Sequence, residues 1–200
     1  MDKKLDYYYG GFVGFLMGVF IIPTAYNLGS RNKPLLIALP LIMVVLFLFG
    51  VWLGKVLGKL MSFIPQFSRF VAVGLLNTAI DFGTLNIISA ITGVHSGVVV
   101  GGINIPGFII AVCNSYFWNK VWVFHDKDKK GFFADFPRFI TVTLIGLLIN
   151  DVLIFIITTY TVPFGNVNPT TWLNIAKAIA TVFTLIWNFL GYKLIVFNRK

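Results

Sequence analysis

Carboxylate and amide side chains lie inside several apolar segments of this sequence. In the stretch RFVAVGLLNTAIDFGTLNII, residues 69–88, Asn77 is followed four residues later by Asp81. A charged group in hydrocarbon costs roughly 2.5 to 3.5 kcal/mol on insertion scales, and such groups usually mark a substrate path or a proton relay. The sequence therefore predicts that Asp81 either pairs with a cation inside a helix bundle or takes up a proton.

Asp151 and Lys177 are also charged residues within apolar segments. A helix rises ~1.5 Å per residue, which puts Asp81 about 18 Å beyond Arg69 and Asp151 about 20 Å beyond Arg138. We expect the two carboxylates at similar depths, slightly outside the midplane of a ~30 Å hydrocarbon core. Because a lysine stem can span one helical turn of depth, Lys177 is the predicted partner of Asp81, with Asp151 competing for it.

Polar residues recur at intervals of three and four in the same segments, which places them on single helix faces. Three segments carry such faces: Asn77, Asp81 and Thr84; Thr143, Gly146 and Asn150; and Asn174, Lys177, Thr181, Thr184 and Asn188. We predict a polar seam through the depth of the bundle. The alternative is that the amides and hydroxyls only hold the helices together, for ~0.6 to 2 kcal/mol each.

Four basic residues stand at corresponding ends of the apolar segments: Arg69, Lys120, Arg138 and Lys193. Arginine binds a phosphate through paired hydrogen bonds, and lysine binds it as a point charge. We predict that these four residues form a basic mouth that binds a lipid phosphate. The alternative is plain anchoring against ordinary anionic lipids.

The composition requires a membrane around these residues. With 58% hydrophobic and 12% charged residues and a mean hydropathy of +0.87, the chain cannot cover a water-soluble domain. A membrane span needs ~20 mostly apolar residues. Six segments qualify: 10–26, 35–58, 69–91, 104–124, 139–160 and 172–197. Gly101, Gly102, Pro106 and Gly107 disfavour a regular helix at the start of the fourth segment.

Lysine and arginine are distributed unequally between the two sides of such a bundle. One side has only Arg31 and Lys33, and Lys177 lies within the last span. The other 13 of the 16 basic residues share one side: Lys3, Lys4, Lys55, Lys59, Arg69, Lys120, Lys127, Lys129, Lys130, Arg138, Lys193, Arg199 and Lys200. Since positive charge marks the cytoplasmic side, we expect both termini in the cytoplasm. The membrane accounts for the basic residues, so no nucleic-acid partner is predicted.

Two rows of glycines mark the first two spans. Gly10, Gly14 and Gly18 form one row, and Gly50, Gly54 and Gly58 form the other. Rows of this kind let two helix backbones approach closely. We predict a tight N-terminal hairpin over residues 1–62 in which these rows let the two backbones approach closely. The alternative is that one row has no packing role.

The other four spans form two similar pairs. RFVAVGLLNTAID and RFITVTLIGLLIND open the pairs, and FWNKVWVF and FLGYKLIVF close them. Both pairs run in the same direction, unlike the inverted repeats of many secondary transporters. The predicted fold is all-α. It is a polytopic membrane helix bundle of six transmembrane helices, with a four-helix core of two parallel repeats over residues 63–200 and the N-terminal hairpin.

These motifs resemble the GtrA-like family of small polytopic membrane proteins, which also occurs as the membrane region of some dolichyl-phosphate mannose synthases. The resemblance covers about residues 66–198, through FSRFVAVGLLNTAIDF, SYFWNKVWVF, RFITVTLIGLLIND and WNFLGYKLIVF. It implies a bacterial inner (plasma) membrane protein that moves polyprenyl-phosphate-linked sugars for cell-surface glycosylation. This chain departs from the family in its hairpin and in having Gly191-Tyr192 where the first closing motif has Trp118-Asn119.

The resemblance and the polar interior together predict a flippase for a polyprenyl-phosphate-linked monosaccharide used in cell-surface polysaccharide or teichoic acid glycosylation. Two alternatives stay open. One is a non-transporting anchor or partner of a polyprenyl-phosphate glycosyltransferase, and the other is a small proton-coupled exporter. The expected partners are the lipid-linked sugar, the lipid bilayer and, for the anchor, that membrane glycosyltransferase. The sequence does not indicate an oligomeric state.

The sequence contains no nucleophile and base pair, metal-ligand cluster or phosphate-cradling glycine loop. We therefore predict that the protein is not an enzyme and uses no cofactor or metal. Trp118, Trp122 and Trp172 are expected as interfacial belt residues with no chemical role.

Overall fold

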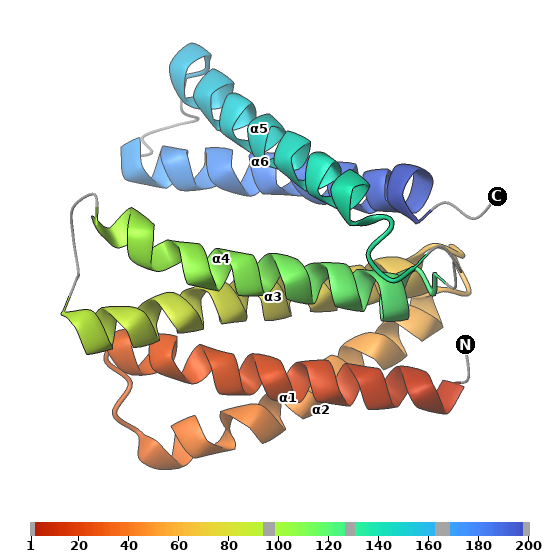
Figure 1. Ribbon diagram of the computed structural model, residues 1–200, viewed down its shortest axis with the longest axis horizontal. Helices are drawn as coiled ribbons and strands as arrows, with labels where there is room; N and C mark the ends of the chain where they lie inside the picture. The colour runs from red at the N-terminus through yellow and green to blue at the C-terminus, as the bar shows by residue number, and fades with distance from the viewer. Residues whose placement is uncertain (1–2, 94–98, 127–130, 163–168, 198–200) are drawn as a thin grey trace. The chain divides into compact units, whose positions relative to one another are not determined.

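The computed structural model describes residues 3–93, 99–126, 131–162 and 169–197. These residues form an all-α structure of six helices and two π-helical turns, as the sequence predicts for the helices (Figure 1). The elements are α1 (Lys3–Asn27), α2 (Lys33–Leu57), α3 (Ile64–Thr92), α4 (Val99–Trp118), η1 (Asn119–Val123), α5 (Phe136–Tyr160), α6 (Pro169–Gly191) and η2 (Tyr192–Val196).

Five described segments are long and apolar enough to cross a membrane: Lys4–Asn27, Lys33–Leu57, Ile64–Thr92, Phe136–Tyr160 and Ile179–Val196. The chain is therefore a multi-pass membrane protein. A crossing by α4 stays a prediction. The expected irregularity at its start is wrong, because the α-helix already begins at Val99 and continues through Pro106. Proline is tolerated in membrane helices where neighbouring groups satisfy the freed backbone.

The chain forms two compact units, Met1–His125 and Asp126–Lys200. The first unit contains α1 to α4 and η1, and the second contains α5, α6 and η2. Within the first unit, α1 packs against both α2 and α3. The N-terminal hairpin is thus continuous with the first helix pair of the core. The domain boundary expected at residue 62 follows the repeats and stays a prediction.

Glycines of α1 allow the close contact of the hairpin. A Cβ on Gly14 would lie 2.7 Å from the carbonyl oxygen of Met43 and 2.9 Å from Cβ of Phe47. A Cβ on Gly18 would overlap the backbone of Pro40. Larger side chains at these two positions would force α1 away from α2.

The glycines of α2 do not face α1, so only the row in α1 contributes to the close approach of the two hairpin helices. Gly54 packs against the side chain of Ser68 at the start of α3, and Gly58 packs against Pro65. A Cβ on Gly50 would meet open space. Gly54 and Gly58 instead serve the tight connection from α2 to α3.

Local sequence explains where two of the helices begin and end. The side chain of Asn32 accepts a hydrogen bond from the N–H of Leu35 at 3.1 Å, and Pro34 lies in the first turn of α2. Helix α3 ends at Gly93, whose φ of 70° is left-handed and whose N–H donates to the carbonyl of Ser89 at 2.9 Å.

Tryptophans fill the interior of the first unit. Trp122 is fully buried and Trp118 is 5% exposed. Tyr9 of α1 packs edge to face on Trp118, with 5.6 Å between ring centroids. The belt interpretation is therefore wrong for Trp118 and Trp122, which pack between helices of the protein. Trp172 is buried as well.

In the second unit, α5 and α6 pair antiparallel (Figure 1). Two glycines lie at the contact between these helices. A Cβ on Gly191 would lie 2.5 Å from Cγ1 of Val142, and one on Gly146 would overlap the side-chain amide of Asn188. Small residues at such contacts are typical of helices that pack within a membrane.

Candidate functional site

A buried ion cluster centred on Asp6 joins four elements of the first unit. The Asp6 side chain is 2% exposed, and its Oδ1 lies 2.8 Å from Arg69 Nε and accepts a hydrogen bond from Trp122 Nε1 at 2.8 Å. Its Oδ2 lies 2.9 Å from Lys55 Nζ and accepts a hydrogen bond from Arg69 Nη2 at 3.0 Å. These residues, Asp6, Lys55, Arg69 and Trp122, are the Asp6 cluster, and they tie α1 to α2, α3 and η1.

The Asp6 cluster holds two cations for one carboxylate. Lys55 also lies over the ring of Tyr7, with Nζ 3.9 Å from the centroid. Removing one member of a buried ion pair typically costs about 3 to 5 kcal/mol. Here the side chains of Lys55 and Arg69 keep 24% and 15% exposure, so water screens part of the interaction. Asp6 is not among the residues predicted from the sequence, because a charge near the end of a span costs little free energy and so does not stand out.

His125 follows η1 in the left-handed backbone region, with a φ of 52°. Burial lowers the pKa of His125 below its ordinary value of 6.5, and the neighbouring Arg69 guanidinium lowers this pKa further. The imidazole is therefore neutral near pH 7. The positive charge at this end of the unit comes from lysine and arginine.

The first closing motif forms the π-helical turn η1. The N–H of Phe124 donates to the carbonyl of Asn119 at 2.9 Å, and the Asn119 amide donates to Ser115 O at 2.8 Å. Lys120, the second residue of the turn, is 3% exposed, with its Nζ 5.8 Å from the ring centroid of Tyr116. Single π-helical turns are rare and occur frequently at functional sites.

The second closing motif forms the matching turn η2. The N–H of Phe197 donates to the carbonyl of Tyr192 at 2.8 Å. The ring of Tyr192 stacks on Phe139 with 4.6 Å between centroids, and its hydroxyl lies 2.7 Å from Thr143 Oγ1. Lys193, again the second residue of the turn, is exposed. Both motifs predicted as counterparts thus share one backbone geometry, while the duplication itself stays a prediction.

The four residues of the predicted basic mouth differ in their surroundings. Arg69 belongs to the Asp6 cluster, and Lys120 is buried. Arg138 is exposed and forms no ion pair with any carboxylate in the described part of the chain. Lys193 is exposed, with Nζ 5.8 Å from the ring centroid of Phe189. Two of the four lie in each compact unit, and their convergence on one phosphate stays a prediction.

A polar contact links α3 to α4 around Asp81. The Asn114 amide donates to Asn77 Oδ1 at 2.6 Å. Oδ1 of Asp81 is buried and accepts no hydrogen bond from the described residues. A Cβ on Gly107 would lie 3.1 Å from this oxygen and 3.3 Å from Thr84 Cβ, so the glycine lets α4 pack onto the carboxylate. Asn114 was not among the residues predicted from the sequence, and Gly107 was expected only to disfavour a regular helix.

The predicted ion pair between Asp81 and Lys177 stays a prediction. The side chains of Lys177 and Asn174 lie outside the described part of the structure. Asp151, the competing carboxylate, is exposed on α5, and Thr181 is exposed on α6.

The polar faces of α5 and α6 meet within the second unit. The Asn150 amide donates to Thr184 Oγ1 at 3.2 Å, and Thr184 Oγ1 donates to Ala180 O at 2.9 Å. Trp187 Nε1 donates to Val142 O at 3.0 Å. Asn188 is half-buried, and its Oδ1 has no partner among the described residues. These contacts hold the helix pair together and leave one amide oxygen available within it.

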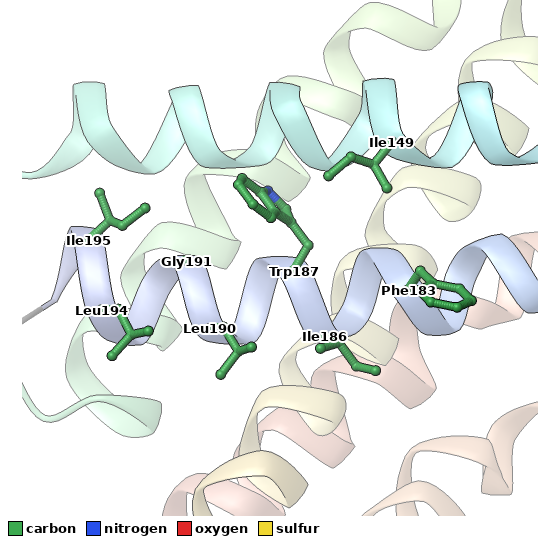
Figure 2. A pocket seen from close by; sticks show the side chains of 8 residues that line it. All are labelled: Ile149, Phe183, Ile186, Trp187, Leu190, Gly191, Leu194 and Ile195. Atoms are coloured by element: carbon green, nitrogen blue, oxygen red, sulfur yellow. The ribbon is translucent and has the colours of Figure 1, made fainter.

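An apolar groove runs along α6 in the second unit (Figure 2). Its volume is about 380 Å³. The lining residues are Ile149 of α5 and Phe183, Ile186, Trp187, Leu190, Gly191, Leu194 and Ile195 of α6 and η2. We call this the α6 groove. Because Lys193 directly precedes Leu194 in η2, one end of the groove lies beside an exposed cation.

The comparisons with known proteins identify the family of this chain. Residues 69–197 match the model of the GtrA/DPMS transmembrane domain family. The chain belongs to this family. It is 28% identical over 135 residues to the uncharacterized membrane protein YngA of Bacillus subtilis (strain 168), covering 68% of this chain and 81% of YngA. No solved structure matches.

The GtrA/DPMS match begins at Arg69, so α1, α2 and two members of the Asp6 cluster lie outside it. The family is linked to polyprenyl-sugar translocation, and its members are generally non-catalytic. The resemblance found in the sequence is thereby confirmed. The hairpin adds Asp6 and Lys55 to an Arg69 and a Trp122 that belong to the GtrA/DPMS core.

Proposed function

We propose that this protein is a flippase for a polyprenyl-phosphate-linked monosaccharide in the bacterial inner (plasma) membrane. Its product would serve cell-surface polysaccharide or teichoic acid glycosylation. Family membership supports the substrate class. The observation that carries the proposal is the position of the exposed Lys193 at one end of the α6 groove. An amphiphile with a phosphate head and a long apolar tail fits a cation beside such a groove.

The roles of the side chains follow from the chemistry of that substrate. The exposed basic residues of the mouth hold the phosphate at the membrane surface, and the prenyl tail stays in apolar surroundings. A sugar needs hydrogen-bond donors and acceptors to replace water as it crosses hydrocarbon. Asn188 Oδ1 in the second unit and Asp81 Oδ1 in the first are buried acceptors without partners among the described residues.

A non-transporting partner of a polyprenyl-phosphate glycosyltransferase is separated from a flippase by direct measurement. The protein is reconstituted into vesicles that contain a polyprenyl-phosphate monosaccharide with its sugar label, and a membrane-impermeant reagent then modifies the lipid in the outer leaflet. A flippase makes nearly all the lipid accessible within the assay. If half stays protected, as in protein-free vesicles, the protein does not move this lipid.

The same vesicles address a proton-coupled exporter. A pH gradient across the membrane would drive such a protein, and cationic compounds would be its cargo. Translocation of the sugar lipid without a gradient favours the proposed flippase, whereas uptake of cations that depends on the gradient and on Asp81 contradicts it.

A further inference from the structure

The two halves of the GtrA/DPMS core carry their cations at matching places. Arg69 and Arg138 each precede the phenylalanine near the start of α3 or α5. Lys120 and Lys193 are each the second residue of a π-helical turn. The surroundings of each pair of cations can therefore be compared position by position.

The cations of the first half are engaged within the protein. The guanidinium of Arg69 donates from Nη2 to Asp6 Oδ2 at 3.0 Å, and its Nε lies 2.8 Å from Asp6 Oδ1 as an ion pair. Arginine uses the same group to bind a phosphate. Lys120 is 3% exposed. An incoming phosphate would have to displace a carboxylate that Lys55 and Trp122 also hold.

The cations of the second half are open. Arg138 and Lys193 are both exposed, and neither forms an ion pair with a carboxylate among the described residues. Their chain neighbours Phe139 and Tyr192 stack with 4.6 Å between ring centroids. This stack holds the start of α5 next to η2. The described part of the second unit contains no helix that corresponds to α1.

We propose that the Asp6 carboxylate occupies the anion-binding position of the first half, so that the substrate phosphate binds in the second half, at Arg138 and Lys193. This inference rests on the proposed function for the identity of the substrate. The α6 groove supports the assignment, because it begins beside Lys193 and takes the apolar chain that a lipid phosphate brings. Inorganic phosphate shares the charge but cannot use the groove.

The inference also gives the N-terminal hairpin a role. The hairpin lies outside the GtrA/DPMS match, and it supplies the carboxylate that neutralises Arg69. The two halves of the core then act unequally, with one half closed by an internal anion and the other half open to the lipid.

Binding of polyprenyl phosphate to the full chain in nanodiscs of neutral lipid tests this assignment. We expect Arg138→Ala and Lys193→Ala each to weaken binding by about tenfold, the effect of losing one charge-assisted contact. Lys59→Ala removes an exposed cation of the first unit and is the matched control, with affinity expected within about twofold of the wild type. Arg138→Lys should restore part of the affinity.

The first half supplies the opposite test. Arg69→Ala should leave the affinity for polyprenyl phosphate unchanged in protein that folds. If Arg69→Ala does not fold, Asp6→Asn serves instead, because it frees Arg69 and should add a second bound phosphate per chain. Loss of binding in the Arg69 variant with normal binding in the Arg138 and Lys193 variants overturns the assignment. The assignment is also overturned if the Asp6→Asn variant still binds only one phosphate per chain and that phosphate is bound by Arg69.

Two further arms identify the ligand. Inorganic phosphate and phosphatidylglycerol are titrated as competitors, and we expect both to displace polyprenyl phosphate only at concentrations about a hundredfold higher, since neither combines the exposed phosphate with a prenyl chain. If phosphatidylglycerol competes as well as polyprenyl phosphate binds, Arg138 and Lys193 only anchor the protein to ordinary anionic lipids, and the assignment is wrong. A wild type that binds no polyprenyl phosphate overturns both the assignment and the proposed substrate. If polyprenyl phosphate binds as described but the protein does not translocate the lipid-linked sugar, the binding site is supported and the proposed flippase function is contradicted.

Discussion

Asp6 Oδ1 accepts a hydrogen bond from Trp122 Nε1 at 2.8 Å across 116 residues of sequence. The bond joins the first turns of α1 to η1, the turn that closes the first helix pair of the core. The N-terminal hairpin is therefore bonded to the core by a buried carboxylate as well as by apolar packing.

This contact predicts a large loss of stability when the carboxylate is removed. Asp6→Asn leaves Lys55 and Arg69 without their anion, which we expect to lower the free energy of unfolding by about 2 to 4 kcal/mol, allowing for their partial exposure. Trp122→Phe removes one hydrogen bond and should cost about 1 to 3 kcal/mol. Thermal unfolding in detergent measures both. Asp151→Asn, at an exposed carboxylate, is the control and should match the wild type.

The close contact between α1 and α2 predicts a position-specific effect of glycine substitutions. Gly14→Leu places a side chain against the backbone of Met43 and should separate the hairpin helices. Gly50→Leu points into open space and should be tolerated. Crosslinking between cysteines placed in α1 and α2 reports the separation. Equal crosslinking in both variants would mean that Gly14 does not set the distance between the helices.

His125 predicts a dependence of stability on pH. Burial and the nearby Arg69 hold the folded-state pKa of His125 below 6.5, so protonation favours the unfolded state. The stabilisation is complete above pH 6.5 and is lost as the pH falls below it, by at most about 1.4 kcal/mol per pH unit. His125→Asn keeps the left-handed backbone available and does not titrate. Its unfolding temperature should change less than that of the wild type between pH 7.5 and 5.5, and an equal change would exclude His125 as the cause.

The predicted pair of Asp81 and Lys177 is tested by a double-mutant cycle. Asp81→Asn and Lys177→Met should each impair folding, because each strands a charge, and the double variant should recover it. If the loss of folding in the double variant equals the sum of the two single losses, the two residues are not paired. Asp81 would then act through hydrogen bonding or proton exchange.

Much of the fold could be predicted from the sequence, because helix length and hydropathy reflect the membrane directly. The six helices and the matching ends of the two helix pairs are visible in the apolar segments and repeated motifs. The sequence does not predict which neighbouring helix each glycine row faces. Both rows have the same spacing, yet Gly14 faces α2 while Gly54 faces α3, because the rotation of a helix depends on all its neighbours.

The candidate site was harder to predict. The sequence shows that Arg69, Lys120, Arg138 and Lys193 stand at matching ends, but it does not show which cations already have partners. Asp6 lies 63 residues from Arg69, and only the packing of α1 on α3 brings them together. The π-helical form of the closing motifs was also not predicted from the sequence.

We propose that the second half of the core binds the phosphate of a lipid-linked sugar and that this protein moves the sugar lipid across the membrane. This proposal is tested by measuring the translocation of a polyprenyl-phosphate monosaccharide in vesicles. The proteins compared are the wild type, the Arg138→Ala/Lys193→Ala double variant and Lys59→Ala. We predict that the wild type and Lys59→Ala expose nearly all the lipid, and that the double variant slows exposure by about a hundredfold. Exposure at the wild-type rate in a folded double variant would show that Arg138 and Lys193 do not hold the phosphate during translocation.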